Sequence, residues 1–238
     1  MEKPERLDKL LAAQGMGSRR DVQKLVRAGA VTVDGAVVKS ADLKVAPGAV
    51  VLVGGRPVTL KKHLYLMLNK PMGVVSASRG AGDVTVVDLV PPALRRQGLF
   101  PAGRLDKDTT GFVLITDDGD FAHDILSPRH HVPKTYLAQV DGDLTPAMAE
   151  AFAAGIDLHG DGPCQPAALS ILAPRTAQVV LREGMYHQIK RMFSACGVHV
   201  TALHRVAMGG LPLDENLAEG ACRELTPAEL EQLRGGQD

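Results

Sequence analysis

Apolar residues recur three and four positions apart near the start of the chain, which predicts two short helices over about residues 6–14 and 18–28. The apolar stripes consist of Leu7, Leu10, Leu11, Val22, Leu25 and Val26. Gly15 and Gly17 interrupt the first pattern, Ser18 is a good N-cap for the second helix, and Gly29 would end it. The chain therefore opens with a pair of helices.

Short β-prone runs follow the two helices. The run from Val31 to Val38 is split by Asp34-Gly35, a strong hairpin signal, and a further strand is expected over residues 50–53. Residues 54–63 contain Gly and Lys with little periodicity and are interpreted as a linker. We therefore expect a small domain over residues 1–60 and a larger one over residues 61–238.

The larger domain alternates short strands with helices but shows no regular βαβ repeat, which favours the α+β class. Strands are expected over residues 64–70, 112–116, 134–140 and 177–181, and helices over residues 120–126, 146–155 and 187–196. In the strand over 134–140, Tyr136, Ala138 and Val140 share one face. In the last helix, Lys190 lies at the border of the apolar face and Arg191 nearly opposite it.

Charge is distributed unevenly along a chain whose net charge is zero. Residues 1–62 carry twelve Lys and Arg against six Asp and Glu, a local charge of +6, and the remainder carries −6. A basic domain ahead of an acidic one is typical of a handle for nucleic acid, because contacts between phosphates and basic side chains provide affinity without sequence specificity. An ordinary solvated surface is the alternative interpretation.

Cysteine and histidine spacing argues against disulfides and metals. The three cysteines form no C-x-x-C pair, and the histidines do not follow a standard ligand spacing, so we expect reduced thiols and no metal. The first residues lack an apolar signal core, and no run is long enough to cross a bilayer. A cytoplasmic protein that does not enter membranes is expected.

The segment from Ala102 to Gly111 combines acidic, basic and hydroxyl side chains between two apolar runs. Asp106 is preceded by Arg104 and followed by Lys107, so a carboxylate lies beside two cations. In an extended chain Asp106 and Asp108 would point in opposite directions. An enzyme acting on a polyanion could keep a nucleophile here, although from spacing alone the segment is interpreted as an ordinary polar turn.

The first domain resembles the S4 RNA-binding domain, in which two helices and a hairpin present a basic face to structured RNA. The matching segments are Arg6-Leu7-Asp8-Lys9, Ser18-Arg19-Arg20 and Val31-Thr32-Val33-Asp34-Gly35. The resemblance implies a mixed helix and strand fold that contacts RNA. The residues expected at that contact are Arg6, Lys9, Ser18, Arg19, Arg20, Lys24 and Arg27.

The larger domain resembles the pseudouridine synthases that modify ribosomal RNA and carry an S4 domain in front. Four segments match in the family's order: Leu68-Asn69-Lys70-Pro71 with Gly73, Gly103-Arg104-Leu105-Asp106 with Thr109-Thr110-Gly111, Lys134-Thr135-Tyr136, and Glu183 to Met192. The resemblance spans nearly the whole chain. It implies a mixed, mainly antiparallel sheet with flanking helices and an isomerase that needs no cofactor.

Site roles follow from the resemblance. It implies that Asp106 is the reacting carboxylate, that Lys190 pairs with it, and that Tyr136 stacks on the flipped uracil. Arg104 would hold or replace the flipped nucleotide. Further substrate contacts are expected from Asn69, Lys70, His187, Ile189 and Arg191, with Ile189 as a wall under the site. Relatives commonly have Arg where this chain has Met185, so a phosphate contact is missing at that position.

Two segments are most similar to the branch that acts on uridine 516 of 16S ribosomal RNA. They are Ser127-Pro128-Arg129-His130-His131 and Tyr186-His187-Gln188-Ile189-Lys190-Arg191-Met192. The expected partner is 16S RNA or a small-subunit assembly intermediate, and we expect a monomer. A 23S RNA synthase of the same family is one alternative. A non-catalytic ribosome-assembly factor is another, although the joint presence of Asp106, Tyr136 and Lys190 argues against it.

Overall fold

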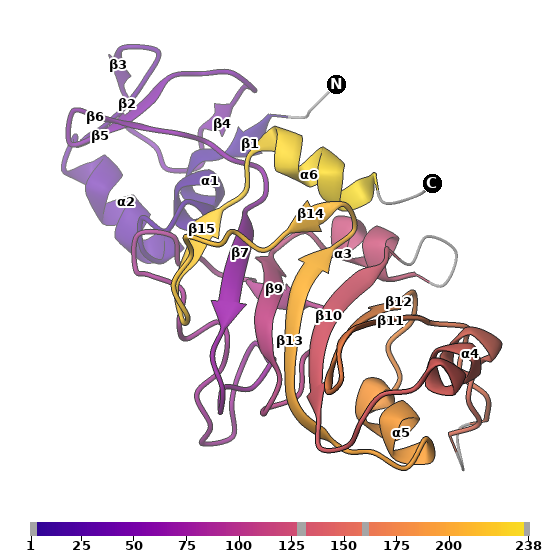
Figure 1. Ribbon diagram of the computed structural model, residues 1–238. Coiled ribbons are helices and arrows are strands. Elements are labelled where there is room, and N and C mark those ends of the chain that lie inside the picture. The colour runs from indigo at the N-terminus through magenta and orange to yellow at the C-terminus, as the bar shows by residue number, and fades with distance from the viewer. Residues whose placement is uncertain (1–3, 128–131, 159–161, 236–238) are drawn as a thin grey trace. The chain divides into compact units, whose positions relative to one another are not determined.

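The computed structural model describes residues 4–127, 132–158 and 162–235. The chain forms two compact units (Figure 1). The first comprises Met1–Leu64 together with Pro91–Leu99, and the second comprises Tyr65–Val90 and Phe100–Asp238. The segment Pro91–Leu99 thus belongs with the N-terminal unit, although the sequence pattern gave no reason to separate it from its neighbours.

Two helices and short strands build the first unit. Helix α1 (Leu7–Ala13) and helix α2 (Arg19–Arg27) form where the apolar spacing predicts them. The Ser18 side chain and Asp21 form a capping box that fixes the start of α2. The strands are β1 (Glu5–Arg6), β2 (Val31–Val33), β3 (Ala36–Val37), β4 (Lys44–Val45), β5 (Val51–Val53) and β6 (Arg56–Val58). They form a β1–β4 pair and a sheet in the order β3-β2-β5-β6.

Two glycine-containing turns shape that four-stranded sheet. Asp34 and Gly35 both have positive φ, as the predicted hairpin between β2 and β3 requires. Gly54 and Gly55 also have positive φ and connect β5 to β6 as a second hairpin. The prediction that residues 54–63 are only a linker is therefore wrong, because a Gly-Gly pair is itself a two-residue hairpin turn.

A mixed, mainly antiparallel sheet forms the second unit, which confirms the predicted α+β class. Its strand order is β11-β12-β10-β13-β9-β7-β15, with β8 on β9 and β14 on β13, and only the β13–β9 pair is parallel among the described strand pairs. The bounds are β7 (Tyr65–Lys70), β8 (Phe100–Ala102), β9 (Thr110–Thr116), β10 (Lys134–Val140), β11 (Ala168–Ala173), β12 (Thr176–Leu181), β13 (Val200–Met208), β14 (Leu211–Pro212) and β15 (Cys222–Glu224).

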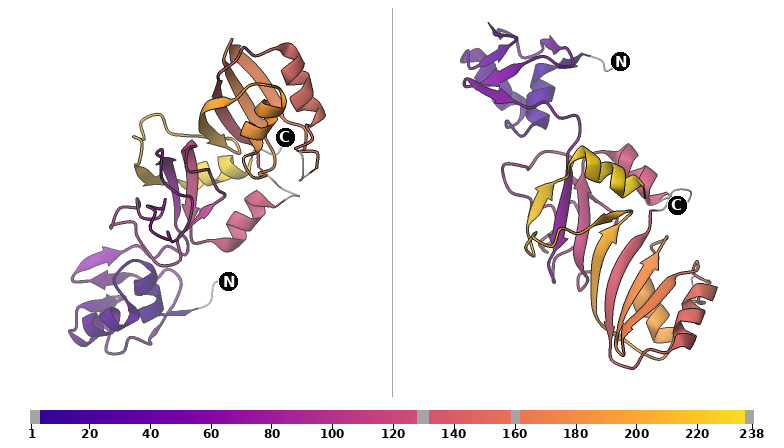
Figure 2. Two further views of the ribbon diagram at one scale, coloured as in Figure 1. Left: turned by 90° about the horizontal axis from the view of Figure 1, so that it is seen from below. Right: turned by 45° about the horizontal axis from the view of Figure 1, so that its top comes forward.

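Helices cover the sheet of the second unit in two groups. Helix α3 (Gly119–Leu126) and helix α6 (Pro227–Arg234) lie near each other (Figure 2), and their residues Phe121, Ile125 and Leu233 join one buried cluster with strands β7 and β9. Helix α4 (Pro146–Ala154) and helix α5 (Gln188–Ala195) meet through Phe152 and Phe193, whose ring centroids are 4.9 Å apart. Helix α5 is thereby held at the other end of the sheet.

Gly111 allows β9 and β13 to approach closely near the centre of this sheet. In register, Lys70 lies opposite Gly111, Gly111 opposite Arg205, and Arg205 opposite Tyr136. Gly111 has φ +101°, and a Cβ atom there would lie 2.3 Å from the Arg205 carbonyl oxygen. Only glycine fits this position without displacing the backbone of β13. The row therefore brings residues from three separate motifs together.

Candidate active site

The loop between β8 and β9 turns sharply at Asp106. The Thr109 amide donates to the Asp106 carbonyl oxygen at 3.1 Å, which closes a turn over residues 106–109. Asp106 and Asp108 consequently face the same cation. The prediction that they point in opposite directions is wrong, because side chains two residues apart lie on the same side even of an extended chain.

Lys190 binds both carboxylates. It lies in the first turn of α5, and its Nζ is 2.9 Å from Asp106 Oδ2 and 2.5 Å from Asp108 Oδ1. Burial alone would lower the pKa of Lys190, but the bonds to the two carboxylates outweigh burial and raise it. The bond from Lys190 in turn lowers the pKa of Asp108. The ammonium thus favours the ionised form of Asp108.

His187 approaches Asp106 from the residue before α5. Its Nε2 lies 3.5 Å from Asp106 Oδ1. The backbone of His187 is in the left-handed region, with φ +49°, which is uncommon for a residue with a Cβ. Such a conformation is retained where the surrounding structure determines it, and functional sites are one such place.

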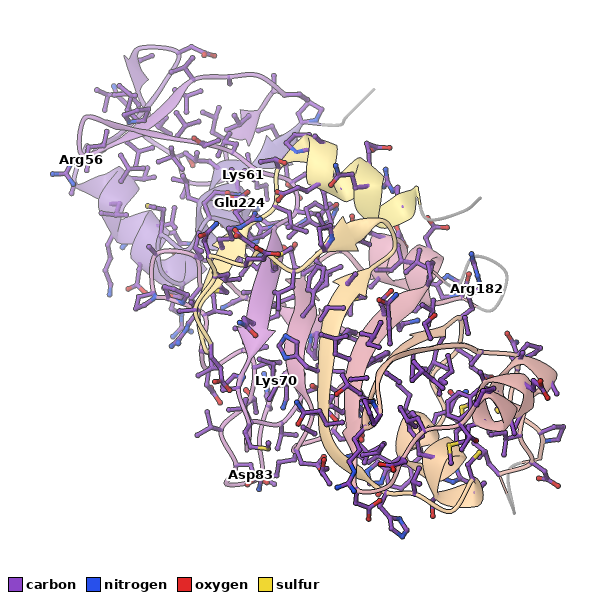
Figure 3. All side chains as sticks on the ribbon, in the orientation of Figure 1. Arg56, Lys61, Lys70, Asp83, Arg182 and Glu224 are labelled. Atoms are coloured by element: carbon purple, nitrogen blue, oxygen red, sulfur yellow. The ribbon has the colours of Figure 1, made fainter. Side chains whose placement is uncertain are left out.

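Lys70 supports the loop from the sheet. Figure 3 labels Lys70 at the end of β7 and Asp83 in the loop that follows. The Lys70 side chain is fully buried, and its Nζ donates to the carbonyl oxygens of Pro71, Lys107 and Thr109. Burial lowers the pKa of Lys70 to about 8. This geometry gives Lys70 a structural role in holding the loop, and its substrate contact stays a prediction.

Tyr136 and Arg205 form a buried pair on the sheet. Tyr136 is 7% exposed and shares a buried face with Ala138 and Val140, as its alternation predicts. Arg205 is 1% exposed; its Nε donates to the Phe112 carbonyl oxygen at 2.6 Å, and its Nη1 lies 3.5 Å from the Tyr136 hydroxyl. Its Nη2 is buried and has no hydrogen-bond partner within the part of the chain that the structure describes. Arg205 therefore contacts the phenol hydroxyl through Nη1, and its Nη2 is left as a buried donor without a partner among the described residues.

Sequence reasoning did not single out Arg205. The signal that could have found it is its place in the apolar phase of β13, two residues after Leu203, where an arginine must be buried. Buried arginines need partners, so such a position indicates either an ion pair or a functional site. The charge of Asp106 raises the pKa of Lys70 and the charge of Arg205 lowers it. Lys70 therefore interacts electrostatically with both the carboxylate cluster and the Tyr136–Arg205 pair.

Comparisons with known proteins identify the family of the chain. Residues 64–195 match the family model described as RNA pseudouridylate synthase, and residues 5–51 match the S4 domain. The chain belongs to the RNA pseudouridine synthase family. It is 44% identical over 237 residues to YtzG of Bacillus subtilis strain 168, described as an uncharacterised RNA pseudouridine synthase, which covers 98% of this chain and 99% of that protein.

Two further relatives cover the synthase almost completely. Ribosomal small subunit pseudouridine synthase A of Escherichia coli strain K12 is 42% identical over 228 residues, or 94% of this chain and 98% of that protein. A solved structure described as a crystal structure of pseudouridylate synthase is 39% identical, covers 96% of this chain and 99% of its own, and superposes with a TM-score of 0.67. Both domains of the synthase therefore lie within the aligned length.

The remaining predicted site residues differ in their surroundings. Arg104 is exposed and Ile189 is buried. Asn69 donates from Nδ2 to the Leu217 carbonyl oxygen at 2.9 Å and so secures the segment before β15. Arg191 donates to the carbonyl oxygens of Tyr186 and Leu158, so its guanidinium anchors two loops. Substrate contacts by these residues stay predictions, and residues 128–131 of the branch-typical segment lie outside the described ranges.

The basic residues of the S4 domain fall into two groups. Arg6 and Arg19 both bind Asp8, whose side chain is 1% exposed, at 3.0 and 2.9 Å, and these bonds lower the pKa of Asp8 to about 2. Lys9 pairs with Glu5 and Lys24 with Asp21. Arg20 and Arg27 are exposed on α2 without a partner among the described residues. We infer that these two are the most available for phosphates.

The two groups predict different variants. Arg20→Ala with Arg27→Ala is expected to weaken RNA binding about 10-fold at low salt and to reduce the salt slope by about two, because each phosphate contact releases a counterion. Arg19→Ala is expected to lower the melting temperature instead, because it removes a partner from buried Asp8. Filter binding over a salt series and calorimetry separate these effects. An unchanged salt slope in the double variant would place the RNA-binding face elsewhere.

Lys134 is a second buried lysine of the synthase domain. It is 4% exposed, and its Nζ donates to the Val132 carbonyl oxygen at 3.3 Å. Burial and, to a lesser degree, the charge of Arg205 lower the pKa of Lys134 to about 7 from the ordinary 10.5. Lys134 shares a sheet face with Tyr136, so its neutral form at slightly alkaline pH limits the positive charge beside Arg205.

This lowered pKa predicts a pH dependence of stability. Between pH 7 and 10.5 the unfolded chain keeps a proton on Lys134 that the folded chain has lost, so the free energy of unfolding rises with pH, by up to about 1.4 kcal/mol per unit. Lys134→Met is expected to remove this rise and to be more stable than wild type at pH 7. Urea unfolding at pH 7.5, 8.25 and 9 measures both slopes. Equal slopes in the two proteins would show that Lys134 is not the responsible group.

Within the described ranges, no group of three or more His, Cys, Asp and Glu side chains is arranged to hold a metal ion. Cys164, Cys196 and Cys222 are free thiols. None of the described helices combines the length and apolar character that crossing a membrane requires.

Proposed function

We propose that the synthase converts uridine 516 of 16S ribosomal RNA to pseudouridine, with Asp106 as the reacting carboxylate. The observation that carries the proposal is the bond between Lys190 and Asp106 at 2.9 Å. It joins two of the four matched segments, although the two residues are 84 positions apart in the sequence. The likeness to the Escherichia coli small-subunit enzyme supports the 16S target. Tyr186-His187-Gln188, the segment typical of this branch, ends two residues before Lys190.

The reaction is an isomerisation that leaves the oxidation state unchanged. The N1–C1′ bond breaks, the uracil turns, and a C5–C1′ bond forms; C5 loses a proton and N1 gains one. A carboxylate is required that attacks C1′ or C6 or abstracts a ribose proton, and Asp106 supplies it. Neither a redox cofactor nor an energy source enters this balance. The ammonium of Lys190 keeps the carboxylate negative while the base is mobile.

Arg104 and Tyr136 act on the flipped nucleotide. Uridine within folded RNA must leave its stack to reach Asp106, at a cost of a few kcal/mol. The exposed guanidinium of Arg104 holds the backbone or occupies the vacated position. Tyr136 stacks on the uracil, and Arg205 contacts its hydroxyl from within the sheet.

Mapping of the modified nucleotides tests the target. Ribosomal RNA from cells with and without the protein is treated with carbodiimide and copied by primer extension, which marks each pseudouridine as a stop. Loss of the stop at uridine 516 of 16S RNA is expected in the deletion strain, and its return with the wild-type gene. Loss of a stop in 23S RNA alone would assign the synthase to the other branch.

A further inference from the structure

Tyr186 is an exposed aromatic residue next to the active site. All eight aromatic side chains lie in the described ranges, and Tyr186, at 75% exposure, is the only exposed one; the other seven are buried or half-buried. Folding gains little from a ring left in water. A chain with only 3% aromatic residues has therefore placed one where packing does not explain it.

The Tyr186 ring stacks on His187, which in turn contacts the carboxylate of Asp106. The Tyr186 and His187 rings lie 3.8 Å apart at 17°, in a parallel stack. His187 Nε2 is in turn 3.5 Å from Asp106 Oδ1. Going outward from the reacting group, the order is carboxylate, imidazole and exposed phenol.

The backbone that presents Tyr186 is held on both sides. The Tyr186 carbonyl oxygen accepts a bond from Arg191 at 3.2 Å, and Arg191 also binds the Leu158 carbonyl oxygen. The buried Gln188 side chain accepts from the Met185 amide at 3.0 Å and donates to Glu183. His187 is fixed in the left-handed conformation between these contacts. A ring held in this way loses little conformational entropy when a ligand stacks on it.

From this geometry we infer that Tyr186, supported by His187, is a stacking platform for a nucleobase adjacent to the target uridine. Flipping the uridine leaves its neighbour without a stacking partner. Aromatic rings of Tyr and His stack on such bases regardless of sequence. The inference rests on the family's action on RNA and not on the choice of 16S RNA, and it adds a second nucleotide subsite to the site of Asp106.

The test uses a synthetic RNA hairpin that carries the uridine found by mapping and that the wild-type enzyme modifies. Stacking on one base contributes about 1–3 kcal/mol, so Tyr186→Ala is expected to raise KM about 10- to 100-fold with kcat changed less than about 3-fold. Tyr186→Phe and Tyr186→Trp are expected to stay within about 3-fold of wild type. Equal melting temperatures are expected, because the ring is exposed.

Abasic nucleotides identify the partner of the ring. Removing the base on the 5′ or the 3′ side of the uridine is expected to raise the wild-type KM on one side only, and on that RNA Tyr186→Ala should add no further loss. Additive losses on both abasic RNAs, or a wild-type KM in Tyr186→Ala, would overturn the inference. A defect in Tyr186→Phe equal to that of Tyr186→Ala would overturn it as well, because the hydroxyl would then be the functional group. Each of these outcomes leaves wild-type turnover, and with it the proposed function, intact.

Discussion

Replacing Asp106 with asparagine is expected to abolish the isomerisation of uridine, with a loss of about 10⁴-fold or more in kcat. Asparagine has nearly the same shape and can still accept a bond from Lys190, which lies 2.9 Å from Asp106 in the wild type. It lacks the negative charge and basicity that the reaction needs. Release of tritium from RNA labelled at C5 of uridine measures the loss.

The Asp106→Asn variant should retain its affinity for RNA. Only one charge near the target uracil is removed, while Arg104 and the basic S4 domain are unchanged. Filter binding to the unmodified RNA and a melting curve serve as controls. Turnover by Asp106→Asn within about 10-fold of the wild type would show that another group reacts with the uridine.

Lys190→Met is expected to lower kcat about 10²- to 10³-fold, because the carboxylates of Asp106 and Asp108 would face each other without their shared cation. Lys190→Arg keeps the charge and is expected to lose about 10-fold or less. Single-turnover tritium release with saturating enzyme separates this loss from any change in binding.

A double variant tests whether charge is the reason for the Lys190 effect. Adding Asp108→Asn to Lys190→Met removes one of the two opposing negative charges, and part of the lost rate should return. If Lys190→Met kept a rate within about 3-fold of the wild type, the ion pair would have no part in the reaction.

The helices and the strands with one buried face could be predicted because the sequence patterns that indicate them are local. Helix α2 is specified by residues that are close together in the sequence. They are the apolar residues Val22, Leu25 and Val26 and the N-cap Ser18. The alternation in Lys134–Val140 likewise reproduces β10 residue by residue. Such patterns depend on short-range geometry, which a single sequence contains.

The parts that were missed depend on partners far away in the chain. Strand β13 and its buried Arg205 can be recognised only when the strands on either side of it, β9 and β10, are known. Lys190, the cation that Asp106 and Asp108 share, lies 84 and 82 residues away from them in the sequence. The bonds from the Lys70 ammonium to three carbonyl oxygens, two of them 37 and 39 residues away, could not be predicted from its motif either. The family resemblance indicated the candidate site residues, and tertiary contacts show which of them lie together.

Lys190 binds Asp106 and Asp108 alike, yet we propose that only Asp106 reacts with the uridine. The most direct measurement compares Asp106→Ala and Asp108→Ala, both shown to be folded, by single-turnover tritium release on the same RNA. Asp106→Ala is expected to show no release above background, and Asp108→Ala to react within about 10-fold of the wild type. Comparable losses in both variants would contradict the claim and would make the pair of carboxylates, rather than Asp106, the functional unit.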